Sequence, residues 1–561
     1  MQTSAMDARH RNAALAAATS EVFDLVVVGG GINGAGIAHD AALRGLRVLL
    51  VEQRDLAFGT SSRSSKLIHG GLRYLEHYHF RLVFEGTNER ALLRRVAPHL
   101  VRPLLFALPV YEGDRHPLWK IQVGMWMYDG LALFKAEHRH IALRSAKRLL
   151  EREPLLRAEG LTGGIIYYDC VTDDARLTLE NAIAATRTGA TVLTRARVVA
   201  LDDLPASRQP ARVTLRDELS GRELAVRGRA IINATGPWVD RTRAAARLES
   251  HLLRPTKGVH VVLPRERLQV HHATALIAPQ DGRVFFAIPW NGRTVIGTTD
   301  TDEGGNPSEL RVEKSDVQYL LSAANHAFPT ARLDERDVIS TWVGLRPLVK
   351  EDSGSASDVS REHQLFRDGR LISLAGGKLT TYRRMAKETV DAAVEILGTA
   401  CQDSSTAEVR LPGAIGLGDL EALQAELVSR VQLPVDVAAR LAGVYGSRAW
   451  EVVAVLQQDP RLVERISPDR DAIMAEVVHA MNTEIALTVD DVLVRRTSIA
   501  LTAADQGRGA AERVADLMGR HLGWDAATRQ KHLDELSHTL DLNNAFRRAP
   551  ERTAEANAAR G

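Results

Sequence analysis

The stretch FDLVVVGGGINGAGIAHDAALRGLRVLLVEQ, residues 23–53, contains the pattern that decides the fold. An apolar run over residues 24–28 predicts a buried strand, and the glycine-rich turn after it leads into a helix with an apolar face ending near Leu43. Gly45 ends that helix, and residues 47–51 form a second apolar run. The order strand, glycine turn, helix and strand predicts a dinucleotide-binding βαβ unit.

The glycines of this turn have separate physical roles. Gly29 permits the tight turn, Gly31 lets the backbone approach a pyrophosphate, and Gly34 lets the helix pack closely on the strand. The free N–H groups at the start of the helix attract phosphates, while Glu52 can accept hydrogen bonds from ribose hydroxyls. A glycine-rich turn without a ligand is the alternative, and the half-site alone leaves NAD and FAD open. The cofactor residues predicted here are Gly29, Gly31, Asn33, Gly34, Glu52 and Gln53.

Composition excludes several classes of protein. The 561 residues include 72 basic and 70 acidic side chains, and this near-neutral balance argues against a nucleic-acid partner. Cys170 and Cys401 are too few for a disulfide framework or a cysteine zinc site, so we predict no metal centre and a reducing compartment. No apolar run reaches the ~18 residues of a spanning helix, and the N-terminus does not resemble a signal peptide.

Three further segments narrow the choice of cofactor. TSSRSSKLIHGGLRYLEHY covers residues 60–78, INATGPWVD covers residues 232–240, and GLRPL at 344–348 is followed by GGKLTTYR at 376–383. In order and spacing, these segments resemble those of the FAD-dependent, membrane-associated sn-glycerol-3-phosphate dehydrogenases of the aerobic, quinone-linked type. The similarity runs from about Phe23 to Arg383, with a weaker helical match to about residue 540.

The resemblance implies the fold of the glycine/D-amino-acid oxidase group. This α/β fold combines a Rossmann-like FAD-binding domain, a mixed-sheet substrate domain and an all-α C-terminal domain. The FAD-binding parts are expected at about residues 22–95, 170–250 and 340–400, and the substrate domain at about 96–169 and 251–339.

Local patterns agree with this division. Asn291-Gly292 between two strand-like runs predicts a type I′ hairpin outside any βαβ unit, and residues 211–236 predict a second hairpin that leads into a buried strand. Helical periodicity predicts a helical domain over residues 419–545, after a linker at 401–418. We expect disordered tails at residues 1–21 and 546–561.

The resemblance also implies how residues 60–71 contact FAD. Hydroxyl and N–H groups at the start of the segment would face the pyrophosphate, the middle would lie along the flavin ring, and Gly70 and Gly71 would allow close approach. The helix opened by GGKLTT would direct its positive end at the flavin's pyrimidine edge. The implied cofactor contacts are Thr60, Ser61, Ser62, Lys66, Leu67, Ile68, Val198, Ala234, Gly236, Gly376, Gly377, Lys378, Leu379 and Thr380.

A set of cations matches the family's substrate pocket. The resemblance carries Arg73, Arg346, Arg361 and Lys378 into it, where a guanidinium can bind phosphate oxygens bidentately. Without the resemblance, each would be interpreted as a surface ion-pair residue.

The predicted reaction is oxidation of sn-glycerol 3-phosphate to dihydroxyacetone phosphate, a step of glycerol and glycerophospholipid metabolism. The C2 hydrogen would leave as hydride to FAD N5 while a base takes the hydroxyl proton, and Arg73, Arg346 and Lys378 would hold the phosphate or polarise the developing carbonyl. His69 and His260 are candidate bases because the pKa of histidine lies near neutrality, and a core histidine is the alternative for each.

The electron acceptor implied by the resemblance is a quinone, with the protein in the cytoplasm and peripheral on the inner face of the cytoplasmic membrane. RHPLWKIQVGMWMYDGLALFK, residues 115–135, is typical of an interfacial helix, although a core helix would look similar. The alternatives are an oxidase that transfers electrons to oxygen, an amine or amino-acid oxidase, and a flavin-binding regulator. The helical domain could serve for homodimerisation, and LTVDDVLVRRTSIAL at 487–501 carries no chemistry that we assign from sequence.

Overall fold

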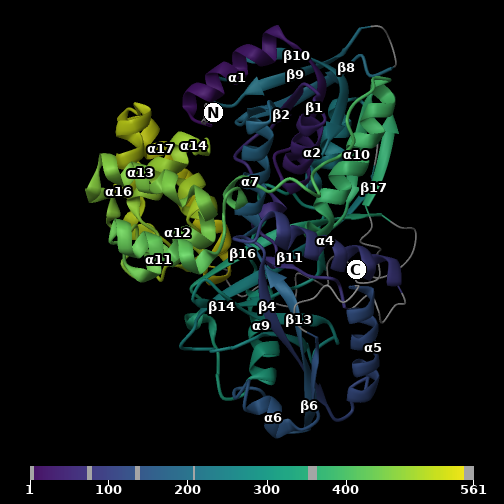
Figure 1. Cartoon of the computed structure of the whole chain (residues 1–561), viewed down its shortest axis with the longest axis vertical. Helices are drawn as coiled ribbons and strands as arrows, with labels where there is room; N and C mark the ends of the chain where they lie inside the picture. Colours follow the sequence, from purple (N-terminus) through teal and green to yellow (C-terminus); the bar gives the residue numbers. More distant parts are fainter. Residues whose placement is uncertain are drawn as a thin grey trace.

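The computed structural model describes residues 6–72, 79–132, 139–205, 209–249, 251–350 and 363–548. Two sheets lie one above the other, and a group of C-terminal helices packs beside them (Figure 1). The fold class predicted from sequence is confirmed. No helix in the described ranges is long and apolar enough to cross a bilayer.

Sheet A, in the upper part of Figure 1, contains the predicted βαβ unit. Its strand order is β17-β18-β10-β1-β2-β7, and the β8–β9 hairpin extends from β10. The strands β18, β10, β1, β2 and β7 run parallel, which matches their continuous apolar sequences because parallel strands are buried on both faces. The strands are β1 (Val22–Val28), β2 (Val48–Val51), β7 (Thr191–Leu193), β8 (Ala196–Asp202), β9 (Ala211–Asp217), β10 (Glu223–Asn233), β17 (His363–Asp368) and β18 (Leu371–Gly376).

Helices α2, α7 and α10 pack side by side next to sheet A, with α2 in contact with both neighbours. The buried side chains of these helices and of the inner strands form one apolar core. The helices outside the C-terminal group are α1 (Ala8–Ser20), α2 (Ile32–Leu43), α4 (Phe80–Val96), α5 (Leu118–Leu131), α6 (Ala146–Leu150), α7 (Asp174–Arg187), α8 (Val239–Ala245), α9 (Lys314–Ala327) and α10 (Tyr382–Leu397).

Sheet B, in the lower part of Figure 1, is mostly antiparallel. Its hairpin β13–β14 turns at Asn291 and Gly292, whose φ angles of 45° and 70° are those of the predicted type I′ turn. Residues 340–349, which we assigned to the FAD-binding part, instead form β16 and pair with β11. The strands are β3 (Leu67–Ile68), β4 (Arg102–Tyr111), β5 (Ile141–Leu143), β6 (Leu161–Val171), β11 (Leu253–Pro264), β12 (Ala273–Ile277), β13 (Val284–Trp290), β14 (Arg293–Gly297), β15 (Thr301–Asp302) and β16 (Ser340–Val349).

The C-terminal group is helical, as its periodicity predicts, and has two apolar clusters of its own. A π-helical turn, η8 (Asp491–Arg496), interrupts it. The α-helices are α11 (Leu420–Val431), α12 (Val435–Tyr445), α13 (Ala449–Gln458), α14 (Met474–Thr483), α15 (Ile499–Thr502), α16 (Arg508–Leu522) and α17 (Ala526–Asn543).

The prediction of a disordered N-terminal tail is wrong for residues 8–20, which form α1. Asp7 caps this helix by accepting a hydrogen bond from the His10 N–H at 2.7 Å. The buried Arg11 pairs with Asp217 and donates to the Thr194 carbonyl, while Ala14 and other small side chains pack on sheet A. Contacts with residues about two hundred positions away therefore hold the helix, and its local composition does not reveal them.

A buried ion-pair cluster fastens the helical group to α7. Glu484 accepts two hydrogen bonds from the Arg176 guanidinium, at 2.6 and 2.7 Å, and lies 3.4 Å from Arg448. Burial alone would raise the pKa of Glu484, but the charge of Arg176 holds that pKa well below its ordinary value of 4.5. A carboxylate with a depressed pKa stabilises the fold above pH 4.5, and this stabilisation is lost as the pH falls through the folded pKa.

We therefore expect Glu484→Gln to destabilise the protein by about 3–5 kcal/mol at pH 7, because the buried Arg176 guanidinium loses the carboxylate that pairs with it. The difference from wild type should shrink on acidification below pH 4.5. Thermal unfolding at several pH values measures both effects. Glu451→Gln is the matched control, since this partly exposed partner of Arg448 should contribute only about 0–1 kcal/mol. Equal losses in the two variants would contradict the expectation.

Candidate active site

The glycine turn brings β1 and α2 into unusually close contact. Gly29 has φ 108° and donates its N–H to the Val51 carbonyl at 2.8 Å. A Cβ atom built on Gly34 would lie 1.8 Å from the Gly29 carbonyl oxygen, so no other residue fits there. The packing role predicted for Gly34 thus has a direct geometric basis.

The first turn of α2 and the end of β2 face each other across this turn. Gly31 is the N-cap and supplies no capping side chain, and the Ile32 N–H donates to the Ser61 hydroxyl at 2.9 Å. Glu52 accepts the Gly30 N–H at 2.7 Å and the Arg54 N–H at 2.8 Å. Burial raises the pKa of Glu52. Each of its carboxyl oxygens can accept a second hydrogen bond, so a ribose hydroxyl is still accommodated. Asn33 and Gln53 are half-buried beside this site.

The hydroxyl groups after Gly59 make mostly protein contacts. Thr60 donates to the Leu345 carbonyl at 2.7 Å, and Ser62 lies 3.5 Å from the Gly59 carbonyl. Lys66 is buried, with its ammonium 2.6 Å from Asp174. The ammonium of Lys66 is thus already engaged by the protein, and the contact of this residue with a cofactor stays a prediction that its backbone could fulfil.

Two of the segments singled out from sequence lie side by side. The His69 N–H and carbonyl both bond to the Thr380 hydroxyl at 3.2 Å, which joins residues 67–71 to η4 (Leu379–Thr381). Gly376 and Gly377 have φ angles of 78° and 96°, and a Cβ on Gly377 would lie 2.1 Å from Met385. The left-handed backbone conformation therefore favours glycine at 377 whether or not a ligand binds, whereas the flexible end of the Met385 side chain could move aside. Lys378 is half-buried at the N-cap of η4, whereas Leu67 and Ile68 are buried in β3.

The strand β10 ends beside the glycine turn. The Ala234 N–H donates to the Val28 carbonyl at 2.9 Å, and Gly236 follows with φ 55°. A Cβ on Gly236 would meet nothing within 4 Å, so the chain leaves open space here. Val198 is half-buried on β8.

His260 lies on β11 of sheet B, between β14 and β16. It is buried in β11, its Nε2 is 2.8 Å from the Ser65 hydroxyl, and its ring stacks on Trp342 with centroids 5.0 Å apart. Its buried Nδ1 has no hydrogen-bond partner among the described residues. Burial, together with the charges of Arg346 and Lys66, holds the pKa of His260 well below its ordinary 6.5.

Arg346 lies on the same face of sheet B as His260. In the β11–β16 ladder Thr256 pairs with Arg346 and His260 pairs with Trp342, so these side chains share one face. The Arg346 guanidinium contacts Asp300 at 3.1 Å and the Thr298 hydroxyl at 2.8 Å. It is thus held in place by neighbours that sequence reasoning did not identify.

Ser65, Asp300 and Trp342 are the contacts that the sequence did not predict. Trp342 is two residues before the GLRPL segment and Asp300 ends the β14 hairpin segment, so each was near a quoted motif. Arg73 and Arg361, predicted to bind substrate, lie outside the described residues.

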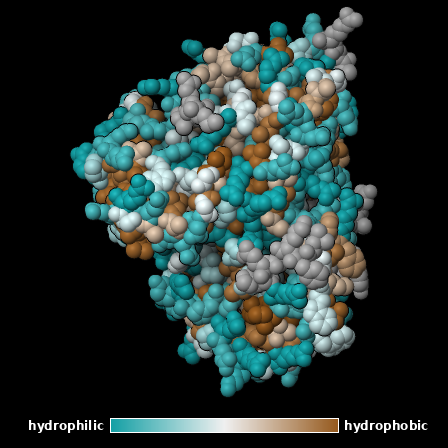
Figure 2. Space-filling model, in the orientation of Figure 1, coloured by the Kyte–Doolittle hydropathy of each residue, from teal (hydrophilic) through white to brown (hydrophobic). Residues whose placement is uncertain are grey.

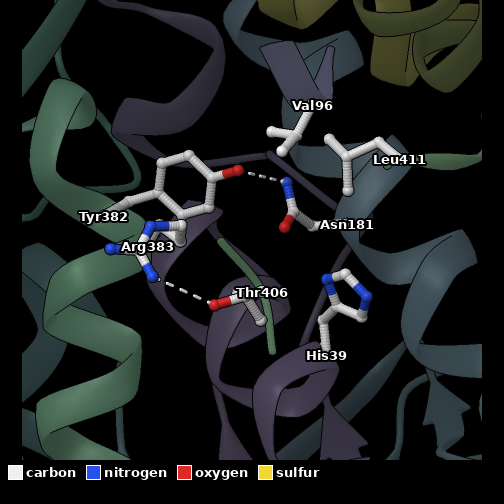
Figure 3. A pocket seen from close by; sticks show the side chains of 8 residues that line it. His39, Val96, Asn181, Tyr382, Arg383, Thr406 and Leu411 are labelled. Atoms are coloured by element: carbon white, nitrogen blue, oxygen red, sulfur yellow. Dashed lines mark hydrogen bonds between the residues drawn. The ribbon is translucent and has the colours of Figure 1, made fainter. Parts of the chain in front are cut away.

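A small cavity is lined by Gly36 and His39 from the middle of α2 and by residues of other elements (Figure 3). Its volume of about 10 Å³ suits one water molecule. The Asn181 amide donates to the Tyr382 hydroxyl at 3.0 Å, and Arg383 donates to Thr406 at 3.2 Å across the cavity. Burial lowers the pKa of His39, which also lines the cavity, to about 4. The cavity is too small for a phosphorylated substrate.

Comparison with known proteins identifies the family. A profile described as FAD dependent oxidoreductase matches residues 24–390, and one described as the C-terminal domain of alpha-glycerophosphate oxidase matches residues 404–529. The chain is 41% identical over 517 residues to glycerol-3-phosphate dehydrogenase 2 of Mycobacterium bovis, which covers 91% of this chain and 86% of that protein. The chain belongs to the family of FAD-dependent glycerol-3-phosphate dehydrogenases.

Two further comparisons agree. The aerobic glycerol-3-phosphate dehydrogenase of Staphylococcus epidermidis is 34% identical over 532 residues, covering 92% of this chain and 94% of that one. The X-ray structure of the glycerol-3-phosphate dehydrogenase from Bacillus halodurans complexed with FAD superposes with a TM-score of 0.80 at 33% identity, covering 96% of this chain and 98% of that one.

The geometry of this family member fits its cofactor, FAD. The first turn of α2, whose N-cap Gly31 has no side chain, suits a pyrophosphate, and the open space beside Gly236 suits a flat ring system. The unpartnered Nδ1 of His260 gives the opposite sheet a polar atom that a ligand can engage.

Proposed function

We propose that this enzyme oxidises the C2 alcohol of sn-glycerol 3-phosphate to dihydroxyacetone phosphate and passes the electrons to a quinone. The observation that carries the proposal is the placement of His260 and Arg346 on one face of sheet B, in a chain whose relatives are named glycerol-3-phosphate dehydrogenases. Bound FAD supplies the hydride acceptor, and the chain supplies orientation, charge and a proton acceptor.

His260 is the proposed base. With the Nε2 proton donated to Ser65, the lone pair of Nδ1 takes the proton from the C2 hydroxyl. Stacking on Trp342 fixes the ring, and the lowered pKa keeps it neutral and able to accept a proton at neutral pH. His69, held through its backbone by Thr380, is the rival base.

Arg346 is proposed to polarise the C2 oxygen as it becomes a carbonyl. Asp300 and Thr298 hold its guanidinium, and its charge already acts on His260, where the proton transfer would occur. Lys378, with Arg73 and Arg361, is proposed to bind the phosphate. Holding a remote phosphate fixes the reacting carbon and removes much of the orientation cost.

Anaerobic addition of sn-glycerol 3-phosphate to the purified enzyme should bleach the flavin absorbance. Arg346→Met should retain the flavin and be reduced about 10²–10³-fold more slowly, since a fixed donor to the developing charge is lost. Stopped-flow absorbance measures the rate, and glycerol without phosphate is the control. A wild-type flavin that this substrate leaves oxidised would contradict the proposed function.

His260→Gln should slow flavin reduction by about 10²–10⁴-fold, the usual contribution of a positioned base. Because the pKa of His260 lies well below 6.5, wild-type reduction should stay level as the pH falls from neutrality through 6.5. His69→Gln is the matched comparison. If His69→Gln is the slower variant, or if the wild-type rate halves near pH 6.5, the assignment of His260 is wrong.

The proposed quinone acceptor requires access to a lipid surface, and α5 offers one. Trp119 and Trp126 are 68% and 60% exposed, and with Val123 and Met127 they follow one face of the helix. The opposite stripe, which includes Met125 and Tyr128, is buried in the core of sheet B. Figure 2 shows pale and brown side chains at the lower right, where α5 lies in Figure 1.

Three features favour a membrane as the partner of this helix face. Exposed tryptophans suit the bilayer interface, Arg115 and Lys120 are exposed on the same segment, and Phe80 and Phe84 of the neighbouring α4 add apolar area. A quinone dissolved in the bilayer could then reach the enzyme at the membrane surface.

Replacing Trp119 and Trp126 together by Ser should reduce co-sedimentation with anionic lipid vesicles by about ten-fold, since two interfacial aromatic anchors are lost. Flavin reduction by substrate should be unchanged. A double Ser variant of Ile415 and Val435, which are exposed on the helical group, is the control and should bind vesicles normally. Unchanged binding of the tryptophan variant would place the lipid contact elsewhere.

Oxygen is the rival acceptor, because the second matching profile is described by a glycerophosphate oxidase. Hydrogen peroxide formed per substrate oxidised distinguishes the two. Stoichiometric peroxide would indicate an oxidase, and turnover that depends on an added quinone would support the dehydrogenase.

A further inference from the structure

The segment LTVDDVLVRRTSIAL contains the π-helical turn η8, and its two consecutive arginines reach the same carboxylate. Arg496 donates to both oxygens of Asp55 at 2.7 and 2.8 Å, and Arg495 donates to Asp55 at 2.6 Å. Neighbouring side chains of a regular α-helix point about 100° apart. The wider π turn accompanies their convergence here, and π turns occur frequently at functional sites. The three side chains are no more than 2% exposed.

The η8 turn and the residues just before it also bind the loop between β7 and β8. Asp491 accepts a hydrogen bond from Arg195 at 2.7 Å, and Thr488 accepts another from Arg195 at 3.1 Å. Arg195 lies between β7 and β8, has φ 57°, and its carbonyl accepts from Glu218. Residues 488–496, which we term the η8 clamp, therefore form hydrogen bonds and ion pairs with the loops that follow β2 and β7.

Both loops belong to the nucleotide half-site. Asp55 lies three residues after Glu52, and in the same loop the Ala57 N–H donates to the Gly30 carbonyl at 3.0 Å. Leu56 packs so closely on the glycine turn that a Cβ on Gly30 would lie 2.9 Å from it. On the other side, the Ala196 N–H donates to the Glu52 carbonyl at 2.8 Å. A shift of either loop would move Glu52 and the turn together.

We propose that the η8 clamp positions the FAD site, so that the C-terminal helices determine how long the cofactor stays bound. The clamp would act through Asp55 and Arg195, to which its side chains donate and accept hydrogen bonds. Buried charges suit this task, because a carboxylate surrounded by two guanidinium groups has one low-energy position. The proposal depends on FAD as cofactor and is independent of the proposed substrate and acceptor.

The test compares FAD release from diluted holoenzyme, followed by flavin fluorescence. Asp55→Asn and Arg496→Lys should release FAD about ten-fold faster or more, the size typical of residues that orient a ligand's direct contacts. The temperature of flavin release should also fall below the temperature of protein unfolding, measured by circular dichroism. Arg195→Lys, on the less buried side of the clamp, should show the same effect and covers the case in which a buried variant fails to fold.

Asp316→Asn is the matched control. Asp316 is also a buried aspartate, and it pairs with Lys257 at 2.9 Å between sheet B and α9. It should lower the unfolding temperature and leave the rate of FAD release unchanged. Unchanged release in the clamp variants would overturn the proposal. Equal acceleration in Asp316→Asn would also overturn it, because the effect would then be general loss of stability.

Discussion

The close contact between α2 and β1 is the constraint on which the site depends. A Cβ atom on Gly34 would lie only 1.8 Å from the Gly29 carbonyl oxygen. Glycine at this position therefore lets the helix begin directly at the carboxyl end of β1. The neighbouring ends of β2 and β10 meet it there, which brings Glu52 and Ala234 to the same edge of sheet A. A side chain at residue 34 would push the helix away from β1 and move its N-terminal N–H groups away from Glu52 and Ala234.

The proposed reacting groups come from sheet B, and three short connections bring them to that edge. Thr60 bonds to the Leu345 carbonyl in β16, Ser65 bonds to His260 in β11, and His69 bonds to Thr380 after β18. The segment that follows Glu52 thus contacts sheet B at its middle and sheet A at its end. One stretch of chain sets the distance between the cofactor edge and the proposed proton acceptor.

The sequence predicted those elements whose structure depends on residues close together in the chain. The strand–turn–helix unit and the Asn291-Gly292 hairpin depend on residues close in sequence, so both were readable. The Asp55–Arg496 contact joins residues 441 positions apart, and the helix α1 depends on Arg11 meeting Asp217. Such pairings have no local signature, which is why residues 487–501 could be recognised as a motif without an assignable role.

The environment of Arg346 bears on which of the predicted cations would bind the phosphate and which would polarise the C2 oxygen. A guanidinium 3.1 Å from Asp300 has part of its charge balanced, so its pull on a doubly charged phosphate is weaker than that of an unpaired cation. Its fixed N–H groups still favour a single oxygen that gains charge during the reaction. Since Arg346 also depresses the pKa of His260, removing Asp300 would strengthen the cation and make the base harder to protonate. In the proposed mechanism, Asp300 therefore balances polarisation of the substrate by Arg346 against the strength of His260 as a base.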